Sequence, residues 1–242
     1  IIKKDKQRWN DYNMDMIKNK FLFNSLLIIF FLILCIIVVG GATRLTGSGL
    51  SMVYWKPIMG IFPPITHVQW QDVFNTYQLY PEYTQKYPNM TLTDFKSIFY
   101  WEYFHRILGR IIGLAILLPF LFQALTKKLT KKSFKLYSLL SVLVIMQGII
   151  GWYMVRSGLV NVAQVSHFRL ALHLSLAFVL AQIVLWNIAN FFIERKRKCP
   201  SIVLQMGINT LCLLCLQIIY GAFTSGMKAG YYFNTYPKMG EE

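Results

Sequence analysis

The apolar residues of this chain gather into five long blocks, which alternate with clusters of lysine and arginine. A helix that crosses a membrane needs about 20 mostly apolar residues, because the hydrocarbon core is roughly 30 Å thick. A soluble domain would instead distribute its apolar positions at a helical or strand period. The pattern therefore predicts an all-α, polytopic transmembrane helical bundle. The predicted spans are Phe21 to Val39, about Ile98 to Leu125, Leu136 to Val155, Leu170 to Ile193, and Ile202 to Phe223.

The basic residues cluster on one side of the predicted spans, whereas the opposite connections carry fewer and more scattered basic residues. The positive-inside bias therefore predicts an N-terminus on the cytoplasmic or matrix side. A net charge of +15 also suits nucleic acid, but these residues flank spans and form no nucleic-acid motif, so no nucleic-acid partner is expected. The clusters are Lys3, Lys4, Lys6, Arg8, Lys18 and Lys20; Lys127, Lys128, Lys131, Lys132 and Lys135; and Arg195 to Lys198.

The longest connection between spans is an outer loop over residues 40–97. Its opening run, from Gly40 to Gly49, is rich in glycine and is expected to form tight turns. Thr66 with Gln69, and Thr91 with Asp94, have the spacing of capping boxes and predict two helix starts. The second of these helices should run from the loop straight into the membrane. Loops of this length are usually functional.

Candidate chemistry is concentrated where that helix enters the membrane. Ionisable residues within a span normally face the bundle interior and mark a site. The alternative is a helix end whose charges pair only with one another and with lipid headgroups, although such an end would not need glycines on the same stripe. One helical stripe, at i, i+3, i+4, i+7, i+8 and i+11, carries Glu102, His105, Arg106, Gly109, Arg110 and Gly113.

A second imidazole is expected at the same depth. His105 precedes Leu125 by 20 residues and His173 precedes Ile193 by 20 residues, which places each about 30 Å from the basic boundary. Their two helices run in the same direction, so the imidazoles could bind one metal from opposite sides. A planar macrocycle between them, with haem as the natural candidate, could approach the backbone at the two glycines of the stripe. Its carboxylates could pair with Arg106, Arg110 or Arg169.

The remaining histidines and the cysteines are expected to lie outside this site. His67 falls in the outer loop, and His167 lies about 240° around the helix from His173. Cys212 and Cys215 have a spacing compatible with redox or metal chemistry, but packing is the favoured interpretation within a span.

Several motifs in this chain begin at Gly40, Met90, Glu102, Gly151, Arg169 and Gly221. Together they resemble haem A synthase of the mitochondrial and alphaproteobacterial type. The resemblance implies eight helices in two similar halves, with five present here. It also implies oxidation of the C8 methyl group of haem O to a formyl group, giving haem A for cytochrome oxidase. Implied partners are haem O as substrate, the lipid bilayer, haem O synthase and cytochrome oxidase assembly factors, in a bacterial plasma membrane or mitochondrial inner membrane.

The resemblance also implies residue roles. His105 and His173 match a histidine pair thought to hold the haem that is oxidised, and Glu102 matches a glutamate one turn before the first histidine. That carboxylate could take up protons during the oxidation. The alternative is a salt bridge with Arg106 at i+4.

An internal repeat divides the chain. Residues 1–193 are predicted to form the first four-helix half, and residues 194–242 a basic linker with the first helix of a second half. The second half would hold haem b, and its remaining helices lie beyond this sequence, so we expect a fragment that is inactive alone and that could self-associate. At a spacing of 180 residues, Gly41, Ala42, Pro57, Met59 and Gly60 recur as Gly221, Ala222, Pro237, Met239 and Gly240.

Two other functions are open at this point. A bis-histidine haem b electron-transfer protein would use the same ligands and would leave Glu102 without a chemical task. A non-enzymatic haem carrier or assembly subunit would use the outer loop for docking.

Overall fold

The protein is described here by a computed structural model, which covers residues 2–54, 59–192 and 200–235, with the backbone alone for residues 2–19. The predicted basic cluster from Arg195 to Lys198 and the repeated Pro57, Pro237, Met239 and Gly240 lie outside the described residues, as does the predicted span end at Ile193.

Five helices are long and apolar enough to cross a membrane, which confirms the predicted class and number of spans. The first span, Lys20–Leu45, is the apolar part of α1 (Ile2–Leu45). The other four are α4 (Leu92–Leu125), α5 (Lys131–Arg156), α6 (His167–Ala189) and α7 (Ser201–Gly226).

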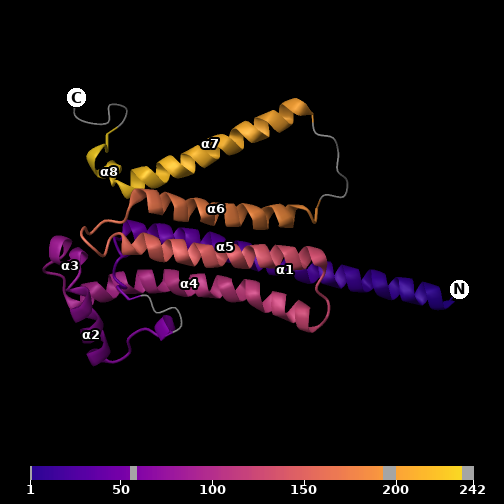
Figure 1. The fold of residues 1–242 in the computed structure, drawn as a ribbon, viewed down its shortest axis with the longest axis horizontal. Coiled ribbons are helices and arrows are strands. Elements are labelled where there is room, and N and C mark those ends of the chain that lie inside the picture. The colour runs from indigo at the N-terminus through magenta and orange to yellow at the C-terminus, as the bar shows by residue number, and fades with distance from the viewer. Residues whose placement is uncertain (1, 55–58, 193–199, 236–242) are drawn as a thin grey trace.

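Four of these helices form a bundle in which α1 and α5 each contact both α4 and α6. Helices α4 and α6 therefore lie diagonally across the bundle, and Figure 1 shows α7 meeting α6 at one end and diverging from it at the other.

We call the end of the bundle that carries the short helices the loop end. These helices are η1 (Met59–Ile61), α2 (His67–Tyr77), α3 (Pro81–Lys86) and α8 (Ala229–Tyr232).

Two predicted capping boxes set the helix starts at the loop end. The Thr66 side chain accepts a hydrogen bond from the backbone N–H of Gln69, and the Gln69 side chain accepts one from the backbone N–H of Thr66. Helix α2 begins directly after Thr66, at His67. Thr91 and Asp94 form the same reciprocal pair at the start of α4. The predicted helix that begins outside the apolar segment and runs into it is thus confirmed as α4.

The expected glycine-rich turn begins later than predicted. Helix α1 continues to Leu45, so Gly40 and Gly41 are helical, whereas Gly47 has the positive φ of +67° that a turn requires. Near this end of the helix, Thr43 donates to the carbonyl of Val39 and Thr46 to that of Ala42.

The bundle core is packed only over the half away from the loop end. There, buried apolar residues of the four helices form one cluster, in which Ile116, Leu140 and Val184 are almost completely inaccessible. The cluster consists of Leu22, Leu26, Ile29, Ile33, Ile112, Ile116, Leu136, Tyr137, Leu140, Leu180, Ala181, Val184 and Ile188. Side chains on the other half of the same helices instead surround a cavity.

A second, aromatic core fixes the loop end onto α4. Trp70, Phe74 and Tyr77 of α2 are buried against Phe95 and Phe99, with ring centroids 4.8 Å apart for Tyr77 and Phe95. This packing holds the connection between α1 and α4 against the bundle and so closes one side of the cavity.

Candidate functional site

A cavity of about 1800 Å³ occupies the loop-end half of the bundle. Residues of α1, α4, α5, α6 and α7 line it, and the loop-end segments cover it. Its walls are mainly apolar, with residues such as Ile37, Val144 and Leu174. A small number of convergent polar groups in an apolar pocket is typical of a ligand site.

His105 reaches the cavity from α4 and lies against a glycine of α1. A Cβ atom on Gly40 would come within 3.1 Å of His105 Nε2, a separation that would force the imidazole to move. The imidazole of His105 can therefore occupy its present position because residue 40 of α1 has no side chain.

His173 reaches the same cavity from α6 and lies against a glycine of α5. A Cβ atom on Gly151 would lie 2.9 Å from His173 Cε1 and 3.4 Å from its Nδ1. One turn earlier on α5, Gln147 Nε2 lies 3.4 Å from His173 Nε2 and donates to the His173 carbonyl at 3.0 Å. Helix α5 thus contacts this imidazole with a glycine and an amide.

The two histidines line one cavity from helices that lie diagonally across the bundle. His105 lies seven residues before the core residue Ile112, and His173 seven residues before Leu180. Each imidazole is therefore about two helical turns, or roughly 10 Å, along its helix from a residue of the packed core. The equal depth of the two imidazoles, counted from Leu125 and Ile193, stays a prediction, because Ile193 lies outside the described residues.

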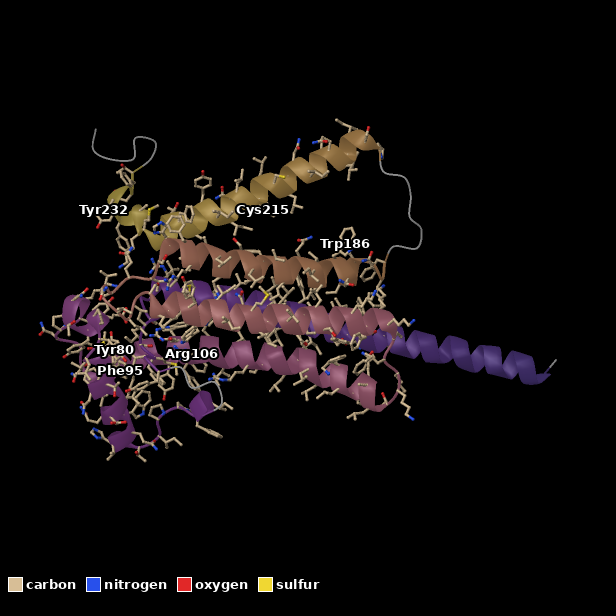
Figure 2. The ribbon with its side chains drawn as sticks, viewed as in Figure 1. Tyr80, Phe95, Arg106, Trp186, Cys215 and Tyr232 are labelled. Atoms are coloured by element: carbon tan, nitrogen blue, oxygen red, sulfur yellow. The ribbon has the colours of Figure 1, made fainter. Side chains whose placement is uncertain are left out.

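Glu102 is buried and fully engaged with its neighbours. Its Oε1 accepts from Arg106 Nη2 at 2.5 Å, and its Oε2 accepts from Ser51 Oγ and the Met52 N–H, both at 2.8 Å. Arg106 also donates to the carbonyls of Met52 and Tyr54. The pair ties the segment after α1 to α4 beside the cavity, and Figure 2 shows Arg106 near the loop end of α4.

The other predicted site residues divide between the cavity and its surroundings. Gly109 and Arg110 line the cavity, whereas Gly113 is not among the lining residues and has nothing within 4 Å of its Cβ position. Arg169 packs its guanidinium 3.6 Å from the ring centroid of Tyr153 and donates to the Tyr153 carbonyl, so it links α6 to α5 outside the cavity.

The residues that we expected to lie outside the site do so. His67 is exposed at the start of α2, and His167 packs against Gly226 and Phe223 where α6 meets α7. Cys212 and Cys215 are exposed on α7 and are not among the residues that line the cavity; Figure 2 shows Cys215 on that helix.

A buried carboxyl group lies at the covered end of the cavity. Burial raises the pKa of Glu82 from 4.5 to about 7, although nearby Lys86 acts in the opposite direction. Tyr77 donates a 3.2 Å hydrogen bond to Glu82, and burial also raises the pKa of that phenol. The neighbouring residues fasten α3 to the α5–α6 connection, because Lys86 and Gln85 donate to the carbonyls of Ala163 and Asn161.

The side chains in the cavity suit a metal ion that is already held by the ring of a cofactor. Among the described residues there is no group of three or more His, Cys, Asp or Glu side chains able to hold a bare ion. Two imidazoles that line one cavity from different helices would instead be able to hold a haem iron. Two further observations fit: glycines stand where side chains would displace the imidazoles, and His173 Nδ1 is buried without a hydrogen-bond partner in the described residues.

Sequence reasoning missed three residues of this site. Gly40 was taken for a turn, and Gly151 and Gln147 were not assigned to the site. A signal for the α5 pair was present, since Gln147 and Gly151 are four residues apart and therefore share a helix face. Only the packing of α5 on α6 identifies His173 as their neighbour.

The fold and the site define an α-helical, multi-pass membrane protein with paired imidazoles in a bundle cavity. Residues 24–242 match the family described as cytochrome oxidase assembly protein, and the chain belongs to this family.

Curated relatives point in the same direction. The Heme A synthase of Flavobacterium psychrophilum is 40% identical over 213 residues, which cover 87% of this chain and 63% of the relative. The Heme A synthase of Pelagibacter ubique is 43% identical over 222 residues, covering 91% of this chain and 65% of the relative. The chain thus spans a little under two thirds of the length of these relatives. No match was found among solved structures.

Proposed function

We propose that this chain is the haem-substrate part of a haem A synthase, which oxidises the C8 methyl group of haem O to a formyl group. The observation that carries the proposal is the pair His105 and His173, which line one cavity from diagonal helices. Family membership and the named relatives support the same activity.

In this proposal His105 and His173 bind the iron, and the haem supplies both the redox-active metal and the methyl group that reacts. Gly40 and Gly151 leave room for the imidazoles, since a side chain at either position would displace the ring beside it. The apolar walls exclude water around the reacting edge, which strengthens the electrostatic interactions inside the cavity.

The cations at the cavity wall are proposed to receive the propionates of the macrocycle. Arg110 lines the cavity from α4, one turn beyond Arg106. Arg106 adds positive charge while its own hydrogen bonds hold the segment after α1. Arg169 was proposed for the same role from the sequence; its stacking on Tyr153 supports a task in orienting α6.

Glu102 is proposed to act next to the first ligand, because it precedes His105 by three residues and lines the same cavity. Oxidation of a methyl group releases protons, and a carboxylate at the wall could accept one. Its contacts with Arg106, Ser51 and Met52 favour the alternative role, in which the carboxylate holds Arg106 and the segment after α1 in place. The two roles predict different phenotypes for Glu102→Gln.

The orientation and partners follow from the same proposal. The basic connection between α4 and α5 lies opposite the loop end, so the positive-inside bias places the N-terminus inside and the cavity toward the outer face. Haem O is the substrate, and haem O synthase and cytochrome oxidase assembly factors are the proposed partners. A second redox centre, haem b in further helices, would accept electrons. Self-association of the chain is a further proposal, supported by the exposed surface of α7.

The test is to express the protein in cells that have no other haem A synthase and to identify extracted haems by mass spectrometry. Haem A is expected when the chain is expressed together with the second half that the family resemblance implies, and it should be lost on His105→Ala or His173→Ala. The chain by itself is expected to bind haem without forming haem A. Unmodified haem b alone would instead favour an electron-transfer protein, and bound haem O that is never converted would favour a haem carrier.

A further inference from the structure

Gln147 is a polar residue in the apolar α5 and lies where that helix faces the cavity. Polar side chains are costly within a membrane span and usually hydrogen-bond to a neighbouring helix. Gln123 of α4 obeys this rule in the packed core, where it donates to Tyr137. Gln147 obeys it at the histidine site.

The amide of Gln147 is held in place by the residue that it contacts. Its Nε2 donates to the backbone carbonyl of His173 at 3.0 Å and lies 3.4 Å from the Nε2 of the same residue. Gly151, one turn further along α5, lies against the Cε1 edge of this ring. The imidazole of His173 therefore has its position set by two residues of one helix.

Hydrogen-bonding capacity remains on both partners. Among the described residues, Gln147 Oε1 and His173 Nδ1 are buried side-chain atoms without a hydrogen-bond partner. A neutral imidazole has one N–H donor and one acceptor nitrogen. If one nitrogen binds a metal, the other must carry the proton, and it needs an acceptor nearby.

We propose that Gln147 is a positioning residue for His173: its amide oxygen accepts the N–H of the imidazole and leaves the other ring nitrogen for the haem iron. The proposal rests on the haem site proposed above. The amide nitrogen now faces the ring Nε2 at 3.4 Å and the oxygen has no partner among the described residues, so the proposed hydrogen bond forms when the amide turns its oxygen toward the ring. This hydrogen bond would fix the ring orientation and raise the basicity of the ligand.

The experiment uses the purified chain loaded with ferric haem b and compares Gln147→Met and Gln147→Glu with the unchanged chain. Methionine keeps the length of the side chain and removes the acceptor, so haem release to apomyoglobin should accelerate about 10- to 100-fold. The midpoint potential should rise, because a less basic ligand stabilises ferric iron less. Glutamate offers a stronger acceptor, so the potential should fall below that of the unchanged chain.

Gln205→Met is the matched control, since Gln205 lies on α7, is not among the residues that line the cavity, and donates to Asn209. It should leave the release rate and the potential unchanged. Unaltered values in both Gln147 variants would overturn the inference while the haem site stands. Shifts of the potential in the same direction for both variants would also overturn it, because they indicate a packing role. An unchanged chain without a bis-imidazole haem signal would overturn the proposed function itself.

Discussion

Gly151 and His173 are so close that a single methyl group on the glycine would lie 2.9 Å from the imidazole Cε1. Real Cβ atoms do not approach that closely, so the ring or helix α5 would have to move. A weaker form of this relationship exists between Gly40 and His105, where a Cβ atom would lie 3.1 Å from Nε2 and the imidazole would have to shift by a few tenths of an ångström. Each proposed ligand thus depends on a glycine in a neighbouring helix.

Gly151→Ala should therefore displace His173 and lower the haem content of the purified protein several-fold. Gly148→Ala is the control on the same helix, because Gly148 also lines the cavity but has nothing within 4 Å of its Cβ position. Alanine there should stabilise α5 by up to about 1 kcal/mol and leave the haem content unchanged. Haem absorbance per protein measures both, and equal losses in the two variants would refute a local role for Gly151.

Replacing Glu102 with glutamine in the full-length enzyme separates proton transfer from positioning. If the carboxylate accepts a proton during the reaction, haem should remain bound while haem A formation falls about 100-fold or more. If its main task is to anchor Arg106 and the segment after α1, haem and activity should be lost together. Ser51→Ala, which removes one of the hydrogen bonds to Glu102 Oε2, is expected to cost about 1 kcal/mol of stability and little activity.

The loop end should become less stable as the pH rises through neutrality. Burial raises the pKa of Glu82 from 4.5 to about 7, so the folded state holds a proton that the unfolded state releases. Its stabilising contribution is complete below pH 4.5 and is lost as the pH rises through about 7. The groups around Glu82 are Tyr77, Lys86, Tyr87, Lys228 and Glu102.

Hydrogen exchange of residues 66–91, corrected for the intrinsic effect of pH, would measure this loss between about pH 5 and 8. The difference could reach about 3 kcal/mol. Glu82→Gln, which cannot ionise, should keep the protection seen at low pH over the whole range. A slope that persists in this variant would assign the effect to another group.

Much of the fold could be predicted from the sequence because span length and helix capping are local properties. The apolar blocks correspond to α1, α4, α5, α6 and α7, and the Thr91 capping box correctly places the start of α4. The continuation of α1 through Gly40 was missed, since glycine on its own favours a turn, and only contact with α4 explains a helical glycine at that position.

The site was predicted in part for a similar reason. A stripe on one helix can be read from spacing, so Glu102, His105, Arg106 and Arg110 were found together. Which residues of other helices face that stripe depends on how the helices pack. Gln147 was therefore not assigned to the site. Arg169, four residues before His173, was expected to face the cavity but lies against Tyr153.

The central claim is that His105 and His173 hold one haem between them. Electron paramagnetic resonance of the purified, haem-loaded ferric protein tests this claim most directly, with His67→Ala and His167→Ala as controls. The account predicts a low-spin signal typical of two imidazole ligands, which His105→Ala and His173→Ala each abolish or convert to high spin and which both controls retain. An unchanged low-spin signal in both ligand variants would contradict it.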